Sequence, residues 1–338
     1  MPTFTDVTQF LGGQIFGRTT LPDVDLSGRT IIVTGANTGL GLEAAKHIAK
    51  LKASKLILAC RNIEKANKAA SIIYDETKCR GHTDIQVWEL DLAKYESTVS
   101  FAKRLSKDLS RLDGFLANAG VEVEEFELAD DLELTIKVNV VSTFLLALGV
   151  LPKLQETSEK YETDTSLTIV GSLIHTFAPD DQLDIDDEKD IFEELSRPET
   201  ADMAQRYPLS KLMSHQCASQ LAKHVSATAK PGRPRVTVNW ANPGWCATEL
   251  VRSKKKTLPE LVLMPLIGWS AEYGSRTLVY ALTAGNETHG CYISESQIKQ
   301  ESSFIQSEKG RKLEERLWGN LTKRLGEIEP DVLKDAGI

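Results

Sequence analysis

The 338-residue chain predicts an α/β fold in which one doubly wound parallel sheet carries helices on both faces. Short, almost continuous apolar runs recur along the chain, and longer stretches with helical periodicity separate them. The runs lie at residues 30–33, 55–59, 85–88, 114–117, 167–170 and 236–240. Strands that are buried on both faces have this pattern, and a helix between successive strands produces right-handed crossovers. We therefore expect one sheet and one main domain.

Several of the separating stretches show helical spacing. Apolar residues line one face of the stretch after the first run: Leu40, Leu42, Ala45, Ile48, Ala49 and Leu51. The same spacing precedes the run that ends at Asn118, with Val99, Ala102, Leu105 and Leu109. A further helix is expected at residues 309–325, from Leu313, Leu317, Leu321 and Leu325. Packing on the domain explains this last stripe better than packing on a partner subunit.

Composition and charge exclude several classes of protein. The 48 acidic and 40 basic residues give a net charge of -8, which argues against nucleic-acid binding. A hydrophobic content of 41% is typical of a folded domain. The five cysteines form no C-x-x-C pair, so neither a disulfide framework nor a zinc site is expected. With no basic leader and no apolar run of about 18 residues, the sequence predicts a cytoplasmic protein without a transmembrane segment.

A glycine-rich turn at residues 34–41 follows the first predicted strand and precedes a helix. Glycines there let backbone N–H groups and a helix N-terminus approach a pyrophosphate. The spacing is G-x-x-x-G-x-G, and glycines also serve helix capping and close packing. Its place after the first strand of an alternating pattern favours dinucleotide binding. The expected contacts come from Gly35, Asn37, Thr38, Gly39, Leu40 and Gly41.

The end of the second predicted strand favours NADP(H) over NAD(H). Dinucleotide folds that prefer NAD carry an acid here, whereas this strand runs into Arg61, whose guanidinium suits a 2′-phosphate. Arg61 could equally be an ordinary surface residue. After the third strand, Asp91 is placed to accept from an adenine amino group and Leu92 to flank the ring. An Asp in that position is also a common helix N-cap.

Three residues form the candidate catalytic group. Tyr207 and Lys211 are four residues apart, which puts them on one face of a predicted helix, and Pro208 requires the pair to lie in its first turn. A nearby ammonium lowers the pKa of a phenol, so Tyr207 becomes a usable acid–base. Ser172 ends a buried strand at the carboxyl edge of the sheet, where ligands bind. Ser172 and Tyr207 together would polarise a carbonyl for hydride attack.

In this order, the motifs resemble those of the short-chain dehydrogenase/reductase family and imply its Rossmann-type fold. The matching residues are Thr34-Gly35-x-x-x-Gly39-x-Gly41, Asn118-Ala119-Gly120, Asn139, Ser172, Tyr207-x-x-x-Lys211 and Asn242-Pro243-Gly244. They cover about residues 28–295. Segments 58–62, 207–212 and 243–250 are similar to the retinol-dehydrogenase-like branch and to fungal reductases of secondary metabolism.

The resemblance implies a role for each matched residue. Tyr207 is the implied acid–base, Lys211 binds the nicotinamide ribose, and Ser172 orients the substrate. Asn139, on a helix expected to begin near Asp130, helps to hold a water that links Lys211 to solvent. Cofactor contacts are also implied for Asn118, Ala119, Gly120, Tyr207, Lys211, Pro243, Gly244 and Thr248. No metal is implied, because the hydroxyl pair handles the developing charge.

The chain departs from the family pattern in one insertion and in two extensions. Ser172 and Tyr207 are 35 residues apart, and the insertion between them contains an acidic segment at residues 180–194. We expect an N-terminal extension (1–27), a catalytic domain (28–295) with an apolar substrate lid at about 245–273, and a C-terminal helical extension (296–338). A basic cluster at residues 252–256 is hypothesised to pair with the acidic segment, although two solvated loops explain both segments more simply.

The sequence thus predicts an NADP(H)-dependent carbonyl reductase that interconverts a small hydrophobic ketone or aldehyde and its alcohol. A non-redox cyclase or dehydratase and a non-catalytic NADP(H)-binding protein are the alternatives. Asn139, Ser172, Tyr207 and Lys211 together disfavour both, because binding alone needs only the glycine turn and Arg61. The resemblance also suggests a homodimer or homotetramer.

Overall fold

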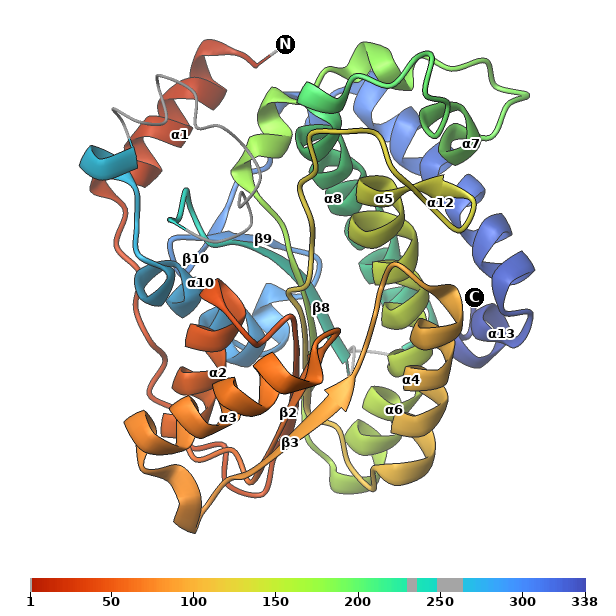
Figure 1. Cartoon of the computed structure of the whole chain (residues 1–338). Helices are drawn as coiled ribbons and strands as arrows, with labels where there is room; N and C mark the ends of the chain where they lie inside the picture. Colours follow the sequence, from red (N-terminus) through yellow and green to blue (C-terminus); the bar gives the residue numbers. More distant parts are fainter. Residues whose placement is uncertain (1, 230–235, 248–263) are drawn as a thin grey trace.

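The computed structural model describes residues 2–229, 236–247 and 264–338, and its centre is an eight-stranded sheet in the order β10-β9-β8-β7-β4-β1-β2-β3 (Figure 1). Six strands are the predicted ones, and they pair in parallel. They are β1 (Thr30–Thr34), β2 (Lys55–Cys60), β3 (Asp84–Glu89), β4 (Gly114–Ala117), β7 (Thr165–Val170) and β8 (Val236–Asn242). The chain winds outward in both directions from β1 and β4, so the predicted doubly wound sheet is confirmed.

Two further strands of this sheet were not predicted, and one of them makes the sheet mixed. β9 (Tyr292–Ser294) is parallel to β8, but β10 (Gln297–Lys299) is antiparallel to β9. Glu295 and Ser296 between them both have positive φ, 50° and 55°, which reverses the chain as a tight hairpin turn does. The predicted parallel sheet is confirmed from β3 to β9, and β10 adds one antiparallel strand at its edge. The two added strands were not foreseen because three-residue strands are too short to show an apolar run.

Helices cover both faces of the sheet (Figure 1). One layer contains α2 (Gly39–Lys50), α3 (Ile63–Thr77) and α10 (Ala271–Thr283), and the other contains α4 (Tyr95–Asp108), α6 (Thr143–Tyr161) and α8 (Met203–Thr228). In β1, Ile31 and Val33 belong to the first core and Ile32 to the second. This alternation explains why the strand is apolar throughout.

The predicted C-terminal helix is α12 (Glu308–Ile328), and it packs beside α8. Leu317, Leu321 and Leu325 are fully buried in the core, which confirms that the leucine stripe packs on the domain. The short helices α11 (Ser303–Gln306) and α13 (Asp331–Ala336) lie on either side of it in the chain. At the other end of the chain, α1 (Phe4–Phe16) lies at the upper left of Figure 1.

The acidic segment forms η4 (Asp180–Leu183) and α7 (Ile191–Leu195), and it pairs with basic side chains of α12. Lys309 Nζ lies 2.8 Å from Asp180, and Arg316 lies 3.2 Å from Asp187. Arg324 lies 3.5 Å from Asp190. The hypothesised partner, the basic cluster at residues 252–256, lies outside the described residues.

Two helix starts differ from the prediction. Asp130 lies in the turn between β5 (Leu128–Ala129) and β6 (Leu132–Glu133), with a φ of 50°, and α5 (Leu134–Ile136) begins only after Glu133, whose carboxylate caps it. α8 begins at Met203, so Pro208 lies in the second turn and not in the first. Pro208 removes one helical hydrogen bond, and packing along this 26-residue helix compensates for the loss.

Among the described residues, the helical stretch Leu134–Tyr161 is the one that is long and apolar enough to cross a membrane. Its 18-residue window has a mean hydropathy of 1.9, and 94% of that window is buried inside the fold. Its apolar composition matches its place in the core, since Phe144 and Leu148 are fully buried there.

Candidate active site

The glycine turn follows β1, where the strand order changes direction between β1 and β4. Gly35 has a φ of 65°, in the left-handed region that favours glycine. A Cβ on Gly41 would lie 2.4 Å from the carbonyl oxygen of Gly35 and 2.5 Å from Asn118 Nδ2. Asn118 Nδ2 also donates to the carbonyl of Thr34 at 2.8 Å. Asn118 therefore joins the ends of β1 and β4 directly, at the edge of the sheet where ligands bind in this fold.

The N-terminus of α2 fits a pyrophosphate. Its N-cap residue, Thr38, makes no side-chain capping hydrogen bond, and the first turn carries no acidic residue. In α3, by contrast, the Asn62 side chain accepts from the N–H of Lys65 at 2.8 Å. The first N–H groups of a helix need acceptors, and the phosphate oxygens of a dinucleotide would satisfy this need at α2. Asn37 and Leu40 flank Thr38 and Gly39 in this turn, and the contacts predicted for these residues with a cofactor stay predictions.

The residues expected at the adenosine end follow β2 and β3. Arg61 is exposed directly after β2. Asp91 Oδ1 accepts from the N–H of Ala93 at 3.1 Å, so its observed contact is a local turn, and Lys94 is the N-cap of α4. Leu92 is buried in the core. The contacts predicted for these residues with a nucleotide stay predictions.

The structure brings Ser172, Tyr207 and Lys211 together. Ser172 stands at the start of η3 (Leu173–Phe177), just beyond β7, and its side chain lies close enough to Tyr207 to lower the pKa of that phenol. Lys211, one turn further along α8, has its Nζ 5.7 Å from the centre of the Tyr207 ring. That ammonium donates to the carbonyl oxygen of Val170, at the end of β7, at 2.8 Å. A hydroxyl pair therefore lies beside one buried cation.

Asn139 joins this group through its amide. It lies in a π-helical turn, Lys137–Ser142, between α5 and α6. Its Nδ2 donates to the Val121 carbonyl at 2.9 Å and to the Ser210 hydroxyl at 3.0 Å, and its Oδ1 accepts from the N–H of Val121. Both amide hydrogens are thus engaged with protein groups, and Asn139 ties the segment after β4 to α8. The water-holding role implied by the family resemblance stays a prediction.

The pKa values of the two titratable groups differ from the expectation. Burial raises the pKa of the Tyr207 phenol, the Glu122 carboxylate raises it further, and the nearby Ser172 side chain lowers it. Burial also lowers the pKa of Lys211 to about 8. The prediction that Tyr207 has a lowered pKa is wrong for the protein alone, because loss of solvation outweighs the favourable contacts.

The turn after β8 completes the edge. Asn242 Oδ1 accepts from the N–H groups of Leu173 and Gly244, at 3.0 and 3.2 Å, which joins the Ser172 side to the Pro243–Gly244 side. Ala119 and Gly120 follow Asn118, and Gly120 packs close to Asn139 and Lys211. Thr248 lies outside the described residues.

The sequence reasoning missed two residues at this site. Glu122 lies two residues beyond the Asn118-Ala119-Gly120 motif, so the sequence pointed to this segment but not to this residue. Gln14 of α1 contacts the turn after β8 by hydrogen bonds between residues 231 positions apart. Nothing in the local pattern of α1 signals such a contact.

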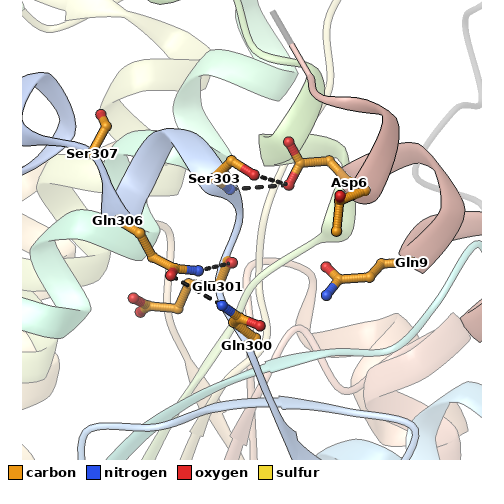
Figure 2. A pocket seen from close by; sticks show the side chains of 8 residues that line it. Asp6, Gln9, Gln300, Glu301, Ser303, Gln306 and Ser307 are labelled. Carbon is orange, nitrogen blue, oxygen red and sulfur yellow. Dashed lines mark hydrogen bonds between the residues drawn. The ribbon is translucent and has the colours of Figure 1, made fainter.

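A separate polar cavity of about 260 Å³ lies between α1 and residues 300–307 (Figure 2). Polar side chains line it: Thr5, Asp6, Gln9, Gln300, Glu301, Ser303, Gln306 and Ser307. None of the predicted site residues lines this cavity, so we do not regard it as the active site.

Comparison with known proteins agrees with this fold and site. Residues 29–160 match the family model for short chain dehydrogenases. The relative "Short chain dehydrogenase/reductase dmxR8" from Cryptosporiopsis sp. (strain 8999) is 39% identical over 332 residues, covering 96% of this chain and 98% of its own length. A crystal structure from Mycobacterium Paratuberculosis shares the fold, with 24% identity, a TM-score of 0.66 and coverage of 92% of this chain and 98% of that chain.

A second solved structure bears on the cofactor. It is a short chain dehydrogenase from Escherichia coli CFT073 complexed with NADPH, 25% identical, with a TM-score of 0.57. The match covers 82% of this chain and 100% of that chain. The fold and the site define an oxidoreductase that depends on a nicotinamide cofactor. More specifically, the chain belongs to the short-chain dehydrogenase/reductase family.

Proposed function

We propose that the protein uses NADPH to reduce an apolar ketone or aldehyde to its alcohol, and that it also catalyses the reverse oxidation. The observation that carries the proposal is the neighbouring pair of Ser172 and Tyr207 side chains beside the buried ammonium of Lys211. The pair lies at the carboxyl edge of the sheet, on the same edge as the glycine turn. One site thus offers a nucleotide cradle and a proton donor.

Each side chain has a distinct part in the reduction. When bound, NADPH supplies the hydride that adds to the carbonyl carbon. Tyr207 transfers its phenolic proton to the carbonyl oxygen, and Ser172 donates a hydrogen bond to the same oxygen. The raised pKa of Tyr207 keeps the phenol protonated near neutral pH, which supports the reductive direction. Lys211, whose pKa is about 8, is mostly cationic at neutral pH and stabilises the phenolate that Tyr207 becomes.

The preference for NADP(H) is part of the proposal and rests on Arg61. Its exposed guanidinium follows β2, and the strand end carries no carboxylate that would bind a ribose 2′-hydroxyl. The solved relative from Escherichia coli CFT073 is complexed with NADPH, which supports the same choice of cofactor. Asp91 and Leu92 are proposed to lie at the adenine.

The apolar character of the substrate is proposed from the turn after Ser172 and from the predicted lid. Phe177 lies in the turn that follows Ser172, and Ile267 and Trp269 belong to the predicted lid. Much of the rest of that lid lies outside the described residues. The division into extensions and a catalytic domain, a cytoplasmic location and assembly into dimers or tetramers stay predictions.

The decisive experiment removes one oxygen atom, that of the Tyr207 phenol. Tyr207→Phe removes the proton donor and keeps the ring, so reduction of a panel of apolar ketones, quinones and aldehydes should fall at least about 100-fold. The dissociation constant for NADPH, measured by calorimetry, should stay within about threefold. Tyr161→Phe, at the C-terminal end of α6, is the matched control and should change neither quantity.

Wild-type turnover in Tyr207→Phe would refute the proposed mechanism. If the wild type binds NADPH and converts a substrate without consuming the cofactor, the protein is instead a non-redox cyclase or dehydratase.

A further inference from the structure

The N-terminal helix α1 meets the carboxyl edge of the sheet through residues on one of its faces. Asp6, Phe10 and Gln14 are four residues apart and therefore form one row along the helix. Asp6 accepts from the N–H and the hydroxyl of Ser303, at 3.0 and 3.2 Å, beside the polar cavity (Figure 2). Phe10 packs edge-on against Phe177, with ring centres 5.6 Å apart. α1 therefore bridges the C-terminal segment and the turn after β7.

Gln14 makes the contacts at the other end of this row. Its side chain is 5% exposed, and its Oε1 accepts from the N–H of Trp245 at 2.8 Å. Its Nε2 donates to the carbonyl oxygens of Trp245 and Ile267, at 3.2 and 2.6 Å. The backbone carbonyl of Gln14 accepts from the indole N–H of Trp269 at 2.9 Å. The amide thus pairs with Trp245 as a neighbouring strand would, and it joins Trp245 to residues 267–269.

The segment that Gln14 holds directly follows the residues assigned to the nicotinamide. Trp245 comes after Pro243 and Gly244, and Gly244 has a φ of 80°. A Cβ on Gly244 would lie 2.6 Å from the Trp269 ring and 3.3 Å from Gln14 Oε1. The turn is therefore packed closely between the end of β8 and α1, and the Gln14 amide determines where its backbone lies.

We propose that Gln14 is a positioning residue, which holds the turn at residues 243–245 in the place where it contacts the nicotinamide half of the cofactor. This inference rests on the proposed function, which assigns the turn to that half. The glycine turn and Arg61 follow β1 and β2, and both β4 and β7 separate those strands from β8. Gln14 therefore acts on one end of the cofactor and not on the other.

This difference between the two ends gives the test. Gln14→Glu keeps the length and one acceptor, but it replaces two donors with a carboxylate facing two carbonyl oxygens. Gln14→Met, which keeps the length without polar atoms, is the second variant in case the first folds poorly. Ser303→Ala is the matched control, because it removes the hydroxyl contact with Asp6 at the other end of α1 and keeps the backbone one. Calorimetry then gives the dissociation constants for NADPH and for 2′-phospho-ADP-ribose, which lacks the nicotinamide.

We expect Gln14→Glu and Gln14→Met to weaken NADPH binding about tenfold or more, and to leave the affinity for 2′-phospho-ADP-ribose within about twofold. Ser303→Ala should leave both affinities unchanged. An equal loss for both ligands would show that α1 only stabilises the fold, and unchanged NADPH binding would show that the turn needs no support. Either result overturns the inference. A wild-type protein that binds neither ligand overturns the proposed function itself, and with it this inference.

Discussion

The nucleotide cradle and the catalytic edge are built in different ways, although both lie at the carboxyl ends of strands in the same sheet. The cradle is one continuous stretch, residues 35–41, in which backbone atoms approach each other closely. The catalytic edge combines side chains from α1, the π-helical turn, η3, α8 and the turn after β8. The cradle is formed by backbone atoms and therefore depends on the absence of side chains. The catalytic edge is formed by side chains and depends on hydrogen bonds between distant segments. The two regions should therefore fail in different ways when they are changed.

The largest effect is expected in the cradle. Gly41→Ala places a Cβ 2.4 Å from the Gly35 carbonyl, and neither backbone can move away without opening the turn. We expect NADPH affinity to fall about 100-fold or more, a loss of about 2.7 kcal/mol, as measured by calorimetry. Gly12→Ala is the control, because nothing lies within 4 Å of its added Cβ. Normal NADPH binding by Gly41→Ala would mean that the cradle is not where the cofactor binds.

At the catalytic edge, the next effect depends on pH. Burial lowers the pKa of Lys211 from 10.5 to about 8. Between these values the unfolded chain holds a proton that the folded chain has released, so stability rises with pH across this window. Below about pH 8 both states are protonated, and the full penalty of the buried charge is present.

Lys211→Met should remove this rise. Urea unfolding at about pH 7.5 and about pH 10 should show the wild type gaining up to about 3 kcal/mol relative to the variant. Other groups titrate alike in both proteins, so they cancel in the difference. A constant difference between the two pH values would show that Lys211 is not desolvated.

A smaller change is expected beside the cradle, where Arg61 follows β2. Arg61→Ala removes a charged donor for a 2′-phosphate, and such a contact contributes about 1.5–3 kcal/mol. The ratio of NADPH to NADH affinity should fall about ten- to 100-fold, while NADH binding stays almost constant. Fluorescence titration with both cofactors measures the ratio. An unchanged ratio would leave Arg61 as an ordinary surface residue.

The smallest effect is expected at the periphery, where the acidic segment meets α12. Lys309 is half exposed and lies 2.8 Å from Asp180. Exposed ion pairs contribute about 0.2–1 kcal/mol, so Lys309→Met should lower the free energy of unfolding by no more than this. NADPH-dependent turnover should not change. A large loss of activity would mean that the insertion acts on the site itself.

Local patterns predicted the parts of the molecule whose structure depends on near neighbours. The apolar runs predicted six strands because burial on both faces demands continuous apolar residues. The short strands β9 and β10 were missed because three residues carry too little pattern. The start of α8 was placed too late because the proline rule considers one hydrogen bond, while the packing of a long helix decides the outcome.

By itself, the sequence determined the doubly wound architecture, the glycine turn and the four-residue spacing of Tyr207 and Lys211, because each depends on residues close together in the chain. Only the tertiary structure decided that Gln14 holds the turn after β8 and that Glu122 acts on Tyr207. It also decided the direction of the Tyr207 pKa shift, since desolvation depends on everything that surrounds a group. Contacts between distant segments leave no periodic signal in the chain, because neither partner is constrained by its neighbours.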